Sequence, residues 1–111
     1  MVEISKADWR LFRERIGGWQ EAHMKKLNKE YIELLSRDEP ESKKFWALEE
    51  RIRWDKNTPG VRLQLKKSEI DWDLIALMRE GVITSADLEG FSAELKEYVL
   101  RRVINRLPDE D

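Results

Sequence analysis

The sequence predicts an all-α protein: a compact bundle of five or six short helices with at most one short extended or strand segment around residues 61–66. Two observations predict this class. Apolar residues recur every three or four positions through most of the chain, and capping or helix-breaking residues separate these stretches. With 111 residues, the chain fits one helical domain, 1–111. We expect a helical hairpin part at about 5–57, and the extended segment with the C-terminal helices at about 60–107.

The amino-acid composition excludes several kinds of protein and of functional site. Charged residues make up 40% of the chain, but the net charge is only -2, which argues against DNA binding by bulk positive charge. The chain has no cysteine, so disulfides, thiolate zinc sites and cysteine nucleophiles are excluded. There is no 18-residue apolar run and no apolar core of a signal peptide near the start. We therefore expect a cytoplasmic protein that does not contact a membrane.

Two apolar helical faces, separated by a glycine pair, occupy the first third of the chain. Ser5 and Asp8 have the spacing of a capping box, in which the hydroxyl and the carboxylate each cap the first turn. Gly17 and Gly18 then predict a break between two helices. The face before the break consists of Trp9, Phe12 and Ile16, and the face after it of Trp19, His23, Leu27, Tyr31 and Leu34.

A third helix is predicted to begin near Pro40, which suits a first helical turn. The apolar stripe of this helix consists of Phe45, Leu48 and Ile52, and we expect it to face the core. At the angular spacing of an α-helix, Trp54 then lies nearly opposite Phe45 and points away from the core.

Residues 61–66 alternate in polarity, with Val61, Leu63 and Leu65 apolar and Arg62, Gln64 and Lys66 polar. This period is typical of a β-strand with one buried face. Because the rest of the chain has helical periodicity, a lone strand would leave its backbone groups unpaired. Three solutions stay open: an extended connector, pairing with a short segment near 2–4 or 82–83, or pairing with its copy across a two-fold axis.

The C-terminal part of the sequence carries two further helix starts. Ser68 with Asp71, and Thr84 with Asp87, have capping spacing, and Gly81 is predicted to end the helix between them. A last helix at about 93–107 has apolar residues on two sides. Such a wide apolar arc must be covered twice, by the chain itself or by a partner.

Several segments resemble small uncharacterised proteins of prophages and integrative elements of gut Firmicutes. These segments are DWRLFRERIGGWQEAHMKKLNKEYIELLS, KFWALEERIRWDK and GVITSADLEGFSAEL, and the resemblance covers about residues 5 to 98. It implies a mobile-element setting, in which products are often regulators or inhibitors of host systems, but it implies no chemical activity.

The sequence contains no catalytic signature. His23 is the only histidine; it is either a general base or a partly buried histidine on an apolar stripe, and no HExxH or ExxH motif surrounds it. Acidic pairs such as Asp71 with Asp73 are typical of solvated helix faces and helix starts. We therefore expect no enzymatic activity, no cofactor, no metal ion and no small-molecule substrate.

The first functional hypothesis is a non-enzymatic protein-binding module that inhibits or modulates a host or defence protein. Trp54 and Trp72 both lie off the apolar stripes of their helices, and large aromatic residues in such positions often anchor interfaces. With Arg53 beside Trp54, these residues form the predicted partner-binding set. A second packing face within the bundle would explain the tryptophans equally well.

The alternative hypothesis is a dimeric DNA-binding regulator. Strand, helix, Gly81 and a Thr84-capped helix resemble the order of a ribbon-helix-helix repressor, in which two chains pair their strands in the major groove. The resemblance implies a homodimer that contacts DNA through Arg62, Gln64, Lys66, Lys67, Thr84 and Ser85. A solvated outer face of a connector would explain the same basic residues.

Overall fold

The computed structural model describes residues 2–104, and these form four α-helices and two short 3-10 helices. The elements are α1 (Lys6–Leu35), α2 (Glu41–Asp55), η1 (Lys67–Glu69), α3 (Ile70–Arg79), η2 (Ser85–Leu88) and α4 (Ala93–Ile104). No strand occurs within residues 2–104, so the all-α class is confirmed. The predicted number of five or six helices is too high.

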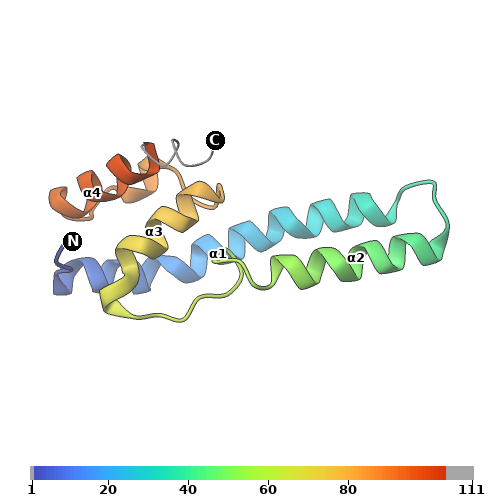
Figure 1. The fold of residues 1–111 in the computed structure, drawn as a ribbon, viewed down its shortest axis with the longest axis horizontal. Helices are drawn as coiled ribbons and strands as arrows, with labels where there is room; N and C mark the ends of the chain where they lie inside the picture. Colours follow the sequence, from blue (N-terminus) through green and yellow to red (C-terminus); the bar gives the residue numbers. More distant parts are fainter. Residues whose placement is uncertain (1, 105–111) are drawn as a thin grey trace.

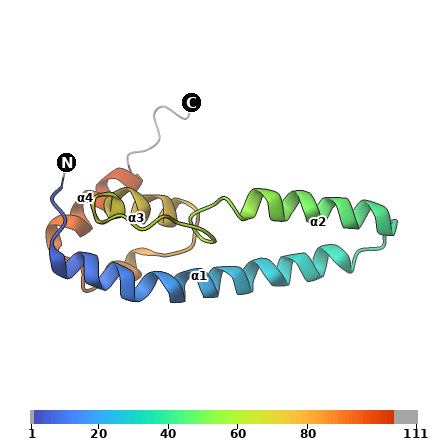
Figure 2. The same cartoon turned by 90° about the horizontal axis from the view of Figure 1, so that it is seen from below.

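The long helix α1 explains most of this difference. It runs unbroken through Gly17 and Gly18, and its 30 residues give it a length of about 45 Å (Figure 2). Two glycines inside a helix cost about 1 kcal/mol each. Packing on both sides of the pair outweighs this cost, because Phe12 and Ile16 are buried before it and Leu27 after it.

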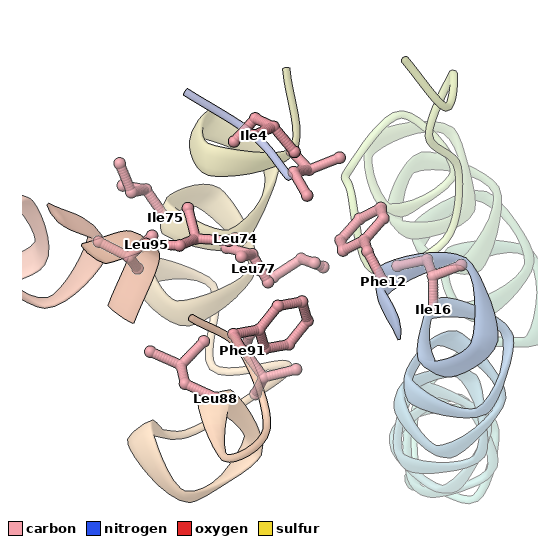
Figure 3. Close-up of a cluster of buried hydrophobic side chains, with 12 residues drawn as sticks. Ile4, Phe12, Ile16, Leu74, Ile75, Leu77, Leu88, Phe91 and Leu95 are labelled. Carbon is pink, nitrogen blue, oxygen red and sulfur yellow. The ribbon is translucent and has the colours of Figure 1, made fainter. Parts of the chain in front are cut away.

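The first half of α1 packs with the C-terminal elements to form the head, which we define as residues 4–19 and 60–104. Figure 3 shows Phe12 and Ile16 of α1 pointing toward Leu77 of α3 and toward Phe91. The helix α1 therefore contributes both to the head and to the hairpin with α2. The buried core cluster consists of Ile4, Phe12, Ile16, Ile70, Leu74, Ile75, Leu77, Ile83, Leu88, Phe91, Leu95 and Val99.

The second half of α1 and the antiparallel helix α2 form the arm, residues 20–56, which projects from the head (Figure 1). Few apolar side chains are buried along it: Leu27 and Leu34 of α1 are buried, whereas the buried residues of α2 are Lys44 and Asp55. The seam of the hairpin is therefore largely polar.

Residues 61–66 form an extended connector between the arm and α3. Leu63 packs against the core cluster, whereas Leu65 is exposed. The turn before the connector is fixed at two points, because Gln20 Nε2 donates to Pro59 O (3.0 Å) and Gly60 N donates to Glu80 Oε1 (2.9 Å). These bonds attach the start of the connector to α1 and to the residue that directly follows α3.

The structure contains some of the predicted helix caps but not all of them. Ser5 Oγ accepts a hydrogen bond from Asp8 N (3.0 Å), but the Asp8 carboxylate binds Ser92 instead of completing a capping box. The Thr84–Asp87 capping box is present, although the element that it begins is the short 3-10 helix η2. The Ser68 cap is wrong, because α3 begins after Glu69 without a side-chain cap.

Candidate protein-binding surface

The predicted core-facing stripe of α2 does not face α1. Phe45 is 61% exposed and Ile52 is 42% exposed, so the prediction that this stripe lies in the core is wrong. The side chains of α2 that the hairpin buries are Lys44, which is 8% exposed, and Asp55. Their polar contacts set the rotation of α2 about its own axis.

Lys44 caps the end of α1. Its ammonium donates to Leu35 O (2.9 Å) and to Arg37 O (3.2 Å). The last carbonyl groups of a helix have no partner within the helix, and a positive charge there also complements the helix dipole. This requirement explains why a lysine is buried while the neighbouring Phe45 is exposed.

A second polar cluster joins the two helices farther along the arm. Tyr31 Oη donates to Asp55 Oδ2 (2.5 Å), and Arg51 Nη2 donates to Glu30 Oε1 (2.8 Å). The Arg51 guanidinium also lies 5.4 Å from the centre of the Tyr31 ring. Burial and then the hydrogen bond to Asp55 raise the pKa of Tyr31 to about 12. The cluster fixes the register of α2 against α1.

Because the polar residues of α2 face inward, its aromatic residues face solvent. Trp54 is 75% exposed at the end of α2, and Trp72 is 53% exposed on α3. Both tryptophans border the turn 57–60. The hollow beside Trp54 is lined by Arg53, Asn57 and Thr58 among others, and the hollow beside Trp72 is lined by Pro59. We call Arg53, Trp54, the turn 57–60 and Trp72 the tryptophan surface.

Arg53 is held in place on this surface by an ion pair within α2. Its guanidinium donates to both carboxylate oxygens of Glu49, at 2.6 Å to Oε1 and 2.5 Å to Oε2. The contact is an i, i+4 pair on an exposed helix face, where solvent screens the attraction between the two charges. Its main effect is to orient the Arg53 side chain beside Trp54.

The predicted DNA-contacting residues lie in two different settings. Arg62 folds back on the end of α2, donating through Nε to Lys56 O (3.1 Å) and through Nη2 to Asn57 Oδ1 (2.8 Å). Thr84 N donates to Asp87 Oδ2 (2.8 Å) at the start of the four-residue helix η2. The remaining predicted contacts, Gln64, Lys66, Lys67 and Ser85, are exposed.

His23 is half-buried against the backbone of the turn, as a Cβ added at Gly60 would overlap its ring. Within residues 2–104, no group of three His, Cys, Asp or Glu side chains is placed to hold a metal ion.

The acidic pair of α3 is less solvated than the sequence predicts. Asp71 is buried, and neither Asp71 Oδ1 nor Asp73 Oδ2 has a hydrogen-bond partner in the described chain. Burial, followed by the charges of Glu69 and Asp71, raises the pKa of Asp73 to about 6. Sequence reasoning missed this because it treated every first-turn carboxylate as solvent-exposed.

Comparison with known proteins gives no further assignment: no protein family, no curated protein and no solved structure matches this chain. In the part of the chain that the structure describes, no helix combines the length and the apolar character needed to cross a membrane.

Proposed function

We propose that this chain is a non-enzymatic protein-binding module and that the tryptophan surface is its contact surface. The observation that carries the proposal is the exposure of Trp54 and Trp72 on either side of one turn. Tryptophan and arginine are the residues most enriched at the centres of protein interfaces, where they contribute most of the binding energy. Both types are present here within one stretch of surface.

The rigid mounting of this surface supports the proposal. The turn 57–60 is attached to α1 through Gln20 and to α3 through Glu80, so the helices that carry the two tryptophans are linked through it. A surface that is ordered before binding loses less conformational entropy when a partner docks.

The nature of the partner follows from charge and from the resemblance of the sequence. A net charge of -2 gives no long-range attraction for nucleic acid, which favours a protein partner. The resemblance to mobile-element proteins favours a host or defence protein that this chain inhibits or modulates. The DNA-binding alternative needs Arg62 free for base contacts, whereas its guanidinium is bonded to the end of α2.

The test begins with a photo-cross-linking amino acid placed at position 54 or 72 of the chain in the organism that carries the gene, with position 10 as the control. We expect one protein to be captured from both test positions and not from the control. That protein is then purified, and its affinity for the wild-type chain and for variants is measured by calorimetry.

In the purified complex, Trp54→Ser and Trp72→Ser are each expected to weaken binding about tenfold or more. The matched control is Trp46→Ser, because Trp46 is also an exposed tryptophan of α2 but lies about two helical turns from Trp54. Equal affinity for all variants, or no common captured protein, would overturn the proposal. Salt-sensitive binding of a DNA duplex by two chains would support the alternative instead.

A further inference from the structure

A largely exposed apolar strip runs along α2 on the side away from Trp54. It consists of Phe45, Leu48 and Ile52, with Leu35 of α1 beside it. Two shallow hollows share Phe45 and Leu48 and extend the strip from Glu41 at one end to Lys56 at the other. The spacing of four and three residues along α2 is that of a helix that packs against another helix.

Within residues 2–104, Leu48 is half-buried, but Phe45, Ile52 and Leu35 of this strip are exposed, although the arm needs the burial. Helices in proteins are stabilised mainly by packing of an apolar face, and a two-helix hairpin has little core of its own. In this arm the buried apolar side chains are Leu27 and Leu34, whereas Phe45 and Ile52 are left in solvent. Two such hairpins packed against each other would form a four-helix bundle.

The strip is complementary, in charge and in the placement of its apolar residues, to a second copy of itself that runs antiparallel to it. Its ends carry opposite charges, with the apolar residues between them: Glu41, which is 91% exposed although it also pairs with Lys44 of its own helix (3.3 Å), lies at one end, and Lys56 lies at the other. Glu41 and Lys56 are equidistant from the midpoint between Leu48 and Glu49, and Phe45 and Ile52 are equidistant from the same point. A two-fold axis near Leu48 would therefore bring unlike charges and apolar side chains together.

We propose that the occupant of the strip is a second copy of this chain, and that two arms pack antiparallel through α2 into a four-helix bundle. Phe45 of one chain packs near Ile52 of the other, and Glu41 lies near the partner's Lys56. A parallel arrangement would instead place Glu41 beside its own copy. Trp54 lies about 160–180° around the helix from Ile52 and Phe45, so the tryptophan surface of each chain stays free.

Sedimentation of the full chain from about 1 to 100 μM tests the proposal. We expect the wild type to form dimers, and Phe45→Ser with Ile52→Ser to raise the dissociation constant about tenfold or more. Both positions are exposed in the single chain, so circular dichroism should show an unchanged helix content. Trp54→Ser, an equally exposed aromatic on the opposite side of α2, is the matched control and should dimerise like the wild type.

A charge exchange tests the antiparallel arrangement even if the serine variant fails to fold. Glu41→Lys alone places like charges at both ends of the interface, and we expect dimerisation to weaken about fivefold at low salt. Because this change also removes the ion pair of Glu41 with Lys44, circular dichroism is recorded to check that the helix content is kept. Adding Lys56→Glu in the same chain restores unlike pairs and should restore dimerisation. A monomeric wild type throughout the concentration range, a dimer that Trp54→Ser disrupts instead, or no restoration by the second exchange would overturn the proposal.

Discussion

The carboxylate of Asp8 accepts two hydrogen bonds from Ser92, one from the backbone N–H at 2.8 Å and one from the hydroxyl at 2.6 Å. Asp8 lies in the first turn of α1 and is 2% exposed, and Ser92 directly precedes α4. Ser92 Oγ in turn accepts from Leu95 N (3.3 Å), which caps the start of α4. One side chain therefore joins the starts of two helices that are far apart in the sequence.

Replacing Asp8 should destabilise the head strongly. Hydrogen bonds to charged groups contribute about 1.5–3 kcal/mol each, and Asp8→Ala also leaves the backbone N–H of Ser92 without its acceptor. We expect the free energy of unfolding in urea to fall by about 2–3 kcal/mol. Ser5→Ala, which removes only the cap of α1, should cost about 1 kcal/mol. Equal losses for the two variants would contradict the bridging role of Asp8.

Replacing Gly60 and replacing Gly17 with alanine should change the stability of the fold in opposite directions. An added Cβ at Gly60 overlaps the His23 ring and lies 2.8 Å from Val82 Cγ2, so Gly60→Ala should destabilise the fold by about 1–3 kcal/mol. Gly17 is helical and exposed with nothing near its Cβ position, so Gly17→Ala should stabilise by about 0.5–1 kcal/mol. Thermal unfolding of the two variants and the wild type measures both changes in stability. His23→Ala removes the closest contact, so Gly60→Ala should cost less in that background.

Asp73 should make stability depend on pH between about 4 and 6. Burial, with Glu69 and Asp71 nearby, raises its pKa from 3.8 to about 6, so the folded state binds the proton more tightly than the unfolded state. The stability that protonation provides is complete below pH 3.8 and is lost as the pH rises to about 6. Above that pH the buried charge is unfavourable.

Asp73→Asn should therefore stabilise the protein at pH 7 by about 1 kcal/mol, a value reduced because the side chain is partly exposed. The gain should disappear near pH 4. Urea unfolding at both pH values measures it, with Glu14→Gln, which removes an exposed carboxylate of α1, as the control. A gain of equal size at both pH values would show that the charge of Asp73 is not its cause.

The head could largely be predicted from sequence. Apolar spacing placed Phe12 and Ile16 on one buried face, because burying these side chains dominates the free energy of folding there. The glycine pair misled the prediction, since glycine is only a weak local signal and packing at both ends of α1 outweighs it.

The arm could not be predicted in the same way. Periodicity grouped the apolar residues of α2 on one face, but the expectation that this face lies in the core is wrong, because Phe45 and Ile52 are exposed. The polar contacts of Lys44, Arg51 and Asp55 with α1 determine which face of α2 points inward. The residues of α1 that make these contacts cannot be identified from the sequence, because they depend on how the two helices pack. Lys44, Arg51 and Asp55 recur at intervals of seven and four along α2, a polar stripe parallel to the apolar one that sequence analysis could have considered.

The contact of Lys44 with the end of α1 gives the last prediction. Lys44→Ala leaves Leu35 O and Arg37 O without their donor, and a partly buried unpaired carbonyl costs about 1–3 kcal/mol. We expect amide hydrogen exchange to become faster around the loop 36–40 and the first turns of α2, with little change in the head, since the head has its own core. The control is Lys43→Ala, because Lys43 is an exposed neighbour whose ion pair with Glu39 is a surface contact. Equal exchange in the two variants, or faster exchange throughout the head, would show that Lys44 does not hold the hairpin end locally.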